Sequence, residues 1–417
     1  MAYDFSTLGA IVGLVIAIVL IIKKVHPAYS LILGALLGGI IGGGGLAVTV
    51  STMVTGASGM MSSVLRIMTS GILAGALIQT GSAEKIAETI VEKLGEKRAL
   101  IAIAIATMII CAVGVFIDIA VITVAPIAIA IGRKAGLTNS SILLAMIGGG
   151  KAGNILSPNP NTIAASEAFS VDLTALMMEN LVPAVFALVA AILLATMLNK
   201  KGQDKIAAAE ENSKDKELPG FLAAFAGPLV VIVLLALRPV FGISIDPLIA
   251  LPVGGLVCIL MTKNVKNTIS ITEFGLSKVI GVSILLIGTG TIAGIIKASA
   301  LQYDVITLIE AMNMPAFILA PLSGILMAAA TASTTAGTTV ASQTFGSILV
   351  EAGVPAISAG AMIHAGATVL DSLPHGSFFH ATGGAVGMSI NDRMKLIPYE
   401  ALVGLTSTVA AIIWYLV

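Results

Sequence analysis

Residues 141–162, SILLAMIGGGKAGNILSPNPNT, contain an apolar run followed by its interruption. The run has the length of a membrane-spanning helix, because a hydrocarbon core of about 30 Å needs about 20 helical residues. Pro158 and Pro160 then remove helix hydrogen bonds and force the residues before them out of the α region. Non-helical backbone at membrane depth persists only where it is buried in protein or lines a cavity. The stretch therefore predicts a broken helix inside a membrane protein.

The composition of the whole chain supports this prediction. Its 417 residues are 57% hydrophobic and 11% charged, with a mean hydropathy of +1.05, whereas soluble domains carry about 25% charged residues. This excludes a soluble enzyme and a disordered chain, and apolar runs longer than the roughly ten-residue alternating segments of a barrel exclude a β-barrel. Lysine plus arginine and aspartate plus glutamate number 22 each, so no basic field exists for nucleic acid. We expect an all-α polytopic membrane protein whose main partner is the lipid bilayer.

Apolar runs of about spanning length predict about 12–14 membrane segments. Twelve are expected near residues 6–22, 28–46, 62–80, 99–117, 141–157, 180–198, 219–238, 246–261, 279–298, 315–330, 356–372 and 398–416. Two further stretches, 118–134 and 333–350, are rich in small or β-branched residues and begin with polar groups. They are either spans or re-entrant hairpins.

A weak internal repeat relates the two halves of the chain. Gly136 and Gly353 are 217 positions apart, as are Asn154 and Asp371. The charged segment 199–218 separates a first membrane half, 1–198, from a second, 219–417. The second half has its own break, DSLPHGS at residues 371–377. Breaks at corresponding places of two inverted repeats are typical of secondary transporters, whose substrate sites lie at the midplane.

The two breaks carry the candidate substrate-binding residues. Helix N-termini and amide or hydroxyl side chains suit a carboxylate, although the first break is also compatible with an ordinary polar turn. The hydroxyl-rich run 333–339 would bind substrate hydroxyls or sodium, or would only pack helices closely through small residues. The expected substrate-binding residues are Asn154, Ser157, Asn159, Asn161, Thr162, Thr335, Ser372, His375 and Ser377.

Charged residues inside apolar stretches are functional candidates by default. Lys151 would pair with an anionic substrate or an internal carboxylate, or would extend to an interface. Asp118 would carry a proton, or would form a structural ion pair with Lys151 or Arg66. Asp371 would serve as a proton site, a cation ligand or a hydrogen-bonding partner, and His375 as a proton relay. The histidine spacing matches no metal site, so no metal or cofactor is expected.

Three segments resemble the gluconate permease (GntP) family. They are FIDIAVITVAP at 116–126, GNILSPNPNTIA at 153–164 and ASTTAGTTVA at 332–341. Their order and spacing are similar to that family over nearly the whole chain. The chain departs from the family's pattern at four places. Asn159 stands where the family carries histidine, Asp118 where it tends to carry glutamate, and Asn161 where it has a small residue or proline. Asp371 and its neighbours stand where the family has a pattern like His-Val-Asn-Asp-Pro.

The resemblance implies a multi-pass protein of the bacterial inner membrane that carries sugar acids or small hydroxy acids with protons. It also implies a homodimer with inverted repeats, a scaffold and a transport domain that moves like an elevator. We therefore expect a proton symporter of a gluconate-like anion and not an enzyme. The alternatives are a sodium-coupled carboxylate transporter, an anion channel, or an intramembrane hydrolase in which Ser157 or Asp118 would act with His375.

Overall fold

The computed structural model describes residues 4–201, 217–311 and 314–417. Within these ranges all regular structure is helical, apart from one isolated bridge between Phe5 and Ser299. This confirms the all-α prediction. Most of the predicted charged segment, 199–218, lies outside the described residues, so the three-part division of the chain stays a prediction.

The helices of the first half are α1 (Thr7–Ile22), α2 (Pro27–Ile41), α3 (Gly45–Ser58), α4 (Met61–Gln79), α5 (Ser82–Leu94), η1 (Glu96–Arg98), α6 (Ala99–Ala112), α7 (Ile117–Lys134), α8 (Asn139–Ile155), α9 (Pro160–Ala168), α10 (Leu173–Glu179) and α11 (Leu181–Lys201). Those of the second half are α12 (Phe221–Phe241), α13 (Pro247–Met261), η2 (Val265–Asn267), α14 (Thr268–Lys297), α15 (Leu301–Ala311), η3 (Ala316–Ile318), α16 (Leu319–Thr331), α17 (Thr334–Glu351), α18 (Ala356–Ala367), α19 (Ser377–Ala385) and α20 (Ile390–Leu416).

Four of the described helices are long and apolar enough to cross a membrane by length and composition: α4, α11, η2 with α14, and α20. Seven shorter apolar helices, of 10–17 residues, accompany them. The number of membrane segments, 12–14, therefore stays a prediction. Helix α14 begins 11 positions before the expected span at 279, because a helix continues through charged residues that face solvent or a cavity, whereas an apolar run ends there.

Helix α3 was not predicted. Its hydroxyl side chains lower the hydropathy of the segment, but they do not prevent a helix, because they bond back to carbonyl groups of the preceding turn. Thr49 Oγ1 donates to the Gly45 carbonyl at 2.6 Å, and Thr55 Oγ1 donates to the Ser51 carbonyl at 3.0 Å.

The helix bounds follow the repeat predicted from the sequence. Helices α17 and α19 begin and end 217 positions after α7 and α9, and α18 begins 217 positions after α8. Helix α20 likewise begins 217 positions after α10. The register agrees with an internal repeat, and the inversion of one copy relative to the other stays a prediction.

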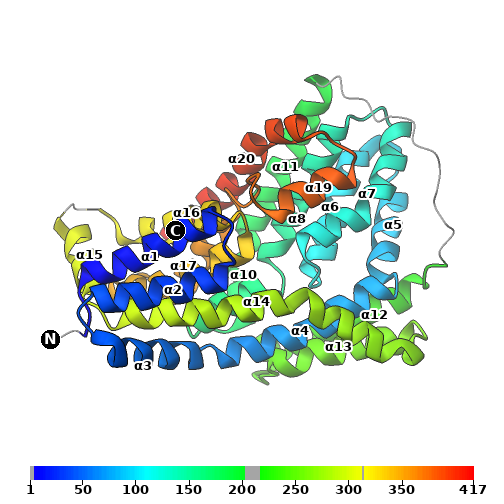
Figure 1. The fold of residues 1–417 in the computed structure, drawn as a ribbon. Coiled ribbons are helices and arrows are strands. Elements are labelled where there is room, and N and C mark those ends of the chain that lie inside the picture. Colours follow the sequence, from blue (N-terminus) through cyan, green and yellow to red (C-terminus); the bar gives the residue numbers. More distant parts are fainter. Residues whose placement is uncertain (1–3, 202–216, 312–313) are drawn as a thin grey trace.

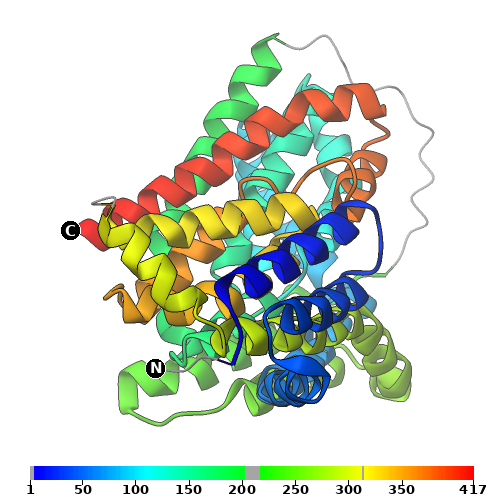
Figure 2. The same ribbon diagram turned by 60° about the vertical axis from the view of Figure 1, so that its left-hand side comes forward.

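Helices α3, α4 and α14 form a long layer along one side of the molecule (Figure 1). Helix α14 packs against α2, α3 and α4, and α13 packs against both α4 and α12. Glycines permit these close crossings: a Cβ on Gly75 would lie 2.5 Å from the Ile271 carbonyl oxygen, and one on Gly56 would lie 2.2 Å from that of Gly290. Figure 2 shows the C-terminal helix α20 on the side of the molecule away from α3.

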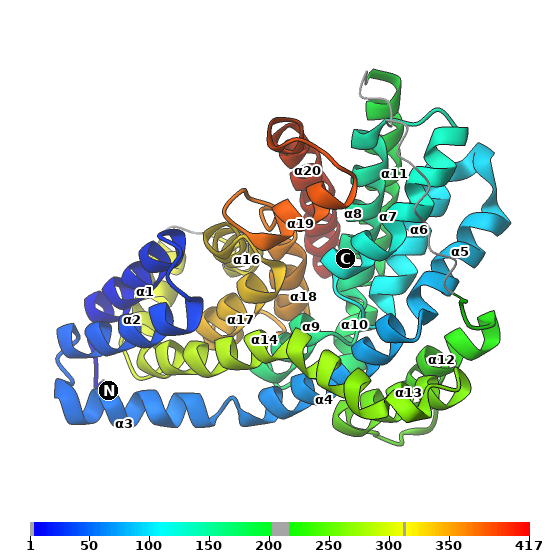
Figure 3. The same cartoon turned by 45° about the vertical axis from the view of Figure 1, so that its right-hand side comes forward.

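A second group of helices surrounds α8, which packs against α6, α7, α11 and α20 (Figure 3). Every residue of α8 from Ser141 to Ile155 is buried. Glycines again allow the closest approach, since a Cβ on Gly149 would lie 2.1 Å from the Ala104 carbonyl oxygen of α6. The central helix therefore holds the first break at a defined place in the interior.

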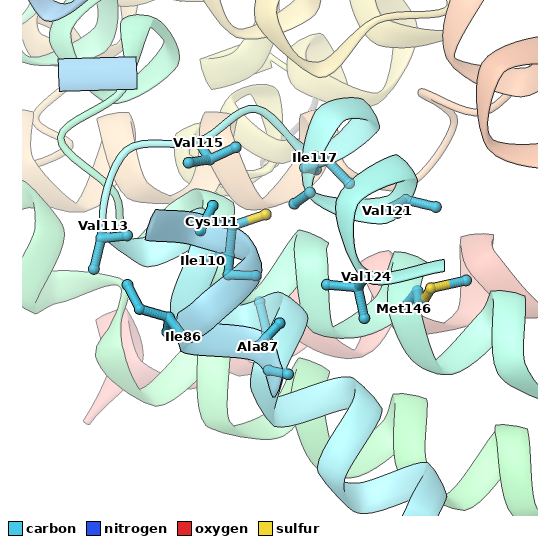
Figure 4. Close-up of a cluster of buried hydrophobic side chains, with 14 of the residues drawn as sticks. Ile86, Ala87, Ile110, Cys111, Val113, Val115, Ile117, Val121, Val124 and Met146 are labelled. Carbon is cyan, nitrogen blue, oxygen red and sulfur yellow. The ribbon is translucent and has the colours of Figure 1, made fainter. Parts of the chain in front are cut away.

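An apolar cluster supports the link between α6 and α7. Figure 4 shows Val113 of this link near Ile86 of α5, and Val115 of the link near Cys111 of α6. Gly114, between these valines, has a φ of +112°, which side chains rarely adopt. The link thus turns the chain sharply and fixes the start of α7.

Candidate functional site

A cavity of about 320 Å³ lies where both helix breaks and two further helix starts meet. Its wall is formed by Phe116, Ile117, Asp118, Ile119, Ile122, Asn154, Asn161, Lys278, Val282, Ala332, Ser333, Thr334, Thr335, Asp371, Ser377 and Phe378. Two pairs of residues 217 positions apart, Asp118 with Thr335 and Asn154 with Asp371, are thereby brought to one site. Of the residues predicted from sequence, Asn154, Asn161, Thr335, Ser377, Asp118 and Asp371 belong to this wall.

Four helix N-termini contribute to the cavity, those of α7, α9, α17 and α19. They pack in pairs, α7 with α19 and α9 with α17. Neither α7 nor α19 is capped by the side chain of its N-cap residue. The first N–H groups of α19 are therefore available to a ligand, whereas in α7 the Asp118 carboxylate accepts from N–H groups of its own turn. Because each N-terminus has a partial positive charge, the four together favour an anion.

The first break is stabilised by its own amides. Asn159 Nδ2 donates to the carbonyl and side-chain oxygens of Asn154, at 2.9 and 2.6 Å. Its Oδ1 accepts from the backbone N–H groups of Asn161 and Thr162 and so caps α9. Asn159 therefore supports Asn154 and Asn161, which reach the cavity, while Asn159 itself is not part of the wall.

The second break is stabilised by a buried ion pair. Lys151 Nζ lies 2.7 Å from Asp371 Oδ1, and the two side chains are 1% and 2% exposed. Thr334 Oγ1 donates to Asp371 Oδ2 at 2.6 Å, and Ser372 Oγ donates to Oδ1 at 3.0 Å. Lys151 also donates to the carbonyl oxygens of Thr368 and Glu400. Lys151 thus pairs with an internal carboxylate, one of the two partners considered from sequence.

A second buried ion pair lies behind the first. Arg393 and Glu400, each 1% exposed, form a bidentate pair within α20. The Arg393 guanidinium also donates to Thr382 Oγ1 at 3.2 Å and lies over the Phe379 ring at 4.8 Å. These contacts attach α19 to α20 and so hold the N-terminus of α19 at the cavity.

A tight contact joins the end of α16 to the second break. Ala332, which ends α16 at the cavity wall, has a φ of +47°, a left-handed conformation that costs a non-glycine residue of order 1–3 kcal/mol. A Cβ on Gly376 would lie 2.6 Å from the Ala332 Cβ. The close approach therefore requires glycine at 376, directly before α19.

Two charged side chains of the wall form no direct ion pair in the described part of the chain, and they attract one another across the cavity. Lys278 enters from α14 and lies 4.7 Å from the ring centroid of Phe274, and Asp118 enters from the first turn of α7. The structural partners considered for Asp118 are engaged elsewhere: Lys151 with Asp371, and Arg66 with Glu167 and Asp246. The sequence analysis did not identify Lys278 as a candidate binding residue, because it lies outside both breaks. Its position as a single charge directly before the apolar run from 279 was the signal that could have identified it.

The other predicted residues lie outside the cavity wall. Ser157 and Thr162 are buried in the first break. His375 Nε2 lies 3.3 Å from the Ala330 carbonyl oxygen, and Ser372 bonds to Asp371. These residues are placed to support the breaks, and their predicted roles in binding or proton transfer stay predictions.

A family model described as the GntP family permease matches residues 5–417. The chain belongs to the GntP permease family. This confirms the resemblance drawn from the three motifs. A protein named as an uncharacterised transporter of Haemophilus influenzae is 54% identical to this GntP permease over 406 residues, 97% of each chain. A gluconate permease of Pseudomonas aeruginosa is 25% identical over 248 residues, 57% of this chain and 55% of that protein. The inner membrane permease YgbN of Escherichia coli is 27% identical over 195 residues, 46% of this chain and 43% of that one.

Two solved transporter structures have a similar fold. The YdaH transporter of Alcanivorax borkumensis superposes with a TM-score of 0.66 at 14% identity, covering 98% of both chains. MtrF of Neisseria gonorrhoeae superposes with a TM-score of 0.59 at 14% identity, covering 89% of this chain and 84% of that one. At such identities the likeness shows the fold alone, that of a polytopic membrane transporter.

Proposed function

We propose that this GntP permease is a secondary active transporter that carries a small hydroxylated carboxylate of the gluconate type together with protons. The carrying observation is the cavity in which four helix N-termini and the unpaired Lys278 converge. The gluconate permease named among its relatives supports the same substrate class.

The charges of the wall favour binding of one carboxylate. Asp371 is already compensated by Lys151, so it repels an incoming anion little. Lys278 then supplies the positive charge, and the uncapped first turn of α19 supplies N–H donors. The carboxylate of the substrate would lie between Lys278 and this N-terminus.

The polar side chains of the wall suit a hydroxylated chain. Asn154 and Asn161 provide amide groups, and Ser333 and Thr335 provide hydroxyl groups, each able to exchange hydrogen bonds with substrate hydroxyls. A volume of about 320 Å³ is within the usual range for small-molecule pockets, roughly 300–1,000 Å³.

Proton coupling would act through Asp118. Its ionised carboxylate in the same wall opposes an anion, and its protonated form does not, so protonation raises the affinity for the anion. By linkage, the bound anion raises the affinity for the proton to the same degree. Asp371 and His375 are secondary candidates, since the first is held in an ion pair and the second lies outside the wall.

The mechanism would be an elevator-like alternation of access. The layer of α2, α3, α4 and α12–α14 would serve as the scaffold, and the helices around α8 that carry both breaks would move along it. We further propose a homodimer in a bacterial inner membrane, with no cofactor besides the coupling ion.

A binding experiment on the purified protein tests the substrate. Thermal stability would be measured with gluconate, glycerate, lactate and citrate, in the presence and absence of sodium. A ligand that binds only the native state stabilises it by about 2.7 kcal/mol at one hundred times its Kd. Lys278→Gln is expected to weaken gluconate binding about tenfold or more, as for a charge-assisted hydrogen bond of about 1.5–3 kcal/mol. The matched control is Lys266→Gln, an exposed lysine of η2 away from the cavity.

The coupling ion is tested in proteoliposomes. Uptake by the parent protein is expected to rise with an inward proton gradient, and Asp118→Asn is expected to remove that dependence while binding persists. Sodium-dependent uptake that ignores pH would instead establish the sodium alternative. Single-channel current or turnover of the bound acid would replace the transporter proposal with a channel or a hydrolase.

A further inference from the structure

A second polar cavity lies between α3, α14 and α17. It has a volume of about 550 Å³, larger than the first. Its wall is formed by Ser51, Thr52, Thr55, Gly56, Gly59, Met60, Ala168, Gly290, Ala293, Gly294, Lys297, Ala298, Ser342, Gln343, Thr344 and Ser347. None of these residues was predicted as functional from the sequence.

Two hydroxyl groups of this wall lack a protein partner. Ser342 and Thr344 are each 1% exposed, and neither side-chain oxygen has a hydrogen-bond partner among the described residues. Many other buried hydroxyls bond back to their own helix, as Thr289 Oγ1 does to the Leu285 carbonyl at 2.9 Å. A buried hydroxyl without a partner costs about 1–3 kcal/mol. Because Ser342 and Thr344 lie on opposite sides of α17, a polar ligand in the cavity would recover this cost for one of the two.

Lys297 supplies the only positive side chain of the wall. It is exposed, and the described residues include no carboxylate within ion-pair distance of it. The wall contains no aspartate or glutamate. An unpaired ammonium group surrounded by hydroxyls and one amide favours a hydroxylated anion.

The same two helices form both cavities. Helix α14 contributes Lys278 to the first cavity and Lys297 to the second, and α17 contributes its N-terminus to the first and its C-terminal half to the second. Four hydroxyl residues of α17 lie between the two cavities: Thr335, Thr338, Thr339 and Ser342. Their helical spacing places them on one face of α17. Thr338 and Thr339 are also buried without a partner for their hydroxyls.

We propose that the cavity at Lys297 is a second binding position for the transported anion, connected to the first by the hydroxyl face of α17. Thr335 and Ser342, which belong to the two walls, are about 10 Å apart along the helix axis at 1.5 Å per residue. The hydroxyl face between them is closed by packing, so the anion passes only when the surrounding helices move. This inference rests on the proposed function, because it concerns the same substrate.

Thiol labelling tests occupancy of the second position. Thr55→Cys places an exposed thiol in its wall, while the native Cys111 and Cys258 are buried. An anionic methanethiosulfonate is expected to label Thr55→Cys about tenfold faster than a cationic one, because the local positive charge concentrates anions. Adding Lys297→Gln is expected to abolish that preference, and gluconate is expected to protect the thiol. Ser270→Cys, on the exposed start of α14, is the control that gluconate leaves unprotected.

Transport kinetics separate this proposal from the first. Lys297→Gln is expected to raise the KM for uptake about tenfold from one side of the membrane only, while gluconate binding at the first cavity persists, and Lys297→Arg is expected to restore the KM. Protection by phosphatidylglycerol vesicles and not by gluconate would overturn the second position in favour of a lipid site. A KM for uptake that is unaltered on both sides of the membrane in Lys297→Gln would also overturn the second position, even if Lys278→Gln abolishes gluconate binding. If both Lys278→Gln and Lys297→Gln bind and take up gluconate as the parent protein does, the proposed function itself is contradicted.

Discussion

The two helix breaks meet at one cavity but are stabilised by different means. The first is neutral, and Asn159 holds it through bonds to residues at most five positions away. The second is charged, and its Asp371 is held by Lys151 and Thr334, which lie 220 and 37 positions away in sequence. Their sequence positions correspond, yet one break is a local structure and the other depends on tertiary contacts.

This difference indicates that the two breaks have different roles. The neutral break brings the Asn154 and Asn161 side chains to the cavity without a charge, whereas the charged break joins α8 of the first half to α17 and α20 of the second. The ion pair also compensates a carboxylate that would otherwise repel an anion in the cavity. Three substitutions test this comparison.

Removing the buried lysine should have the largest effect. Lys151→Ala leaves Asp371 buried without its partner, and breaking a buried ion pair in this way costs about 3–5 kcal/mol. The measurement is denaturant or thermal unfolding in detergent. The double variant Lys151→Met with Asp371→Asn should recover much of the loss, because no unpaired charge remains. Equal stability of Lys151→Ala and the parent protein would contradict the structural role of the pair.

Removing the amide of the first break should have an intermediate effect. Asn159→Ala removes the cap of α9, at about 1 kcal/mol for a helix N-cap, and releases Asn154 at the cavity. Gluconate affinity should therefore fall together with stability. Ser389→Ala, which removes the exposed cap of α20, should cost similar stability and leave affinity unchanged. Matching affinity losses in both variants would argue against a specific role of Asn159.

The exposed ion pairs near the end of α9 should matter least. Arg66 of α4 contacts both Glu167 of α9 and Asp246, which caps α13. The Arg66 guanidinium donates to Asp246 and holds the pKa of that carboxyl below its usual value. Since the pair is partly exposed and screened, Asp246→Asn should cost only about 0.2–1 kcal/mol.

The pH dependence of this small effect has a definite sign. A lowered folded-state pKa contributes stability above the unfolded value, about 3.9 for aspartate, and loses it as the pH falls through the folded pKa. The stability difference between the parent protein and Asp246→Asn should therefore be constant near neutral pH and shrink below about pH 4. Melting curves over that range measure it, and a difference that grows with acidity would exclude the assigned pair.

Much of the fold followed from local sequence. Pro158 and Pro160 end α8 and begin α9 for a backbone reason that needs no neighbours, and the 217-position register found in the sequence recurs in the bounds of α17 and α19. Helix α3 could not be predicted, since hydropathy does not register hydroxyls that bond to their own helix. The early start of α14 was missed for a related reason: Lys278 ends an apolar run but not a helix.

The sequence by itself determined the class of protein, the family and the two breaks, because hydropathy, proline geometry and motif spacing act over short distances. It also supplied Asp118, Asn154, Thr335 and Asp371 as candidates, all of which line one cavity. Only the tertiary structure decided which polar groups remain free. Lys151 forms an ion pair with Asp371, whereas Lys278 forms no direct ion pair with a described residue. Charge pairing of this kind depends on distances between helices that are remote in the chain.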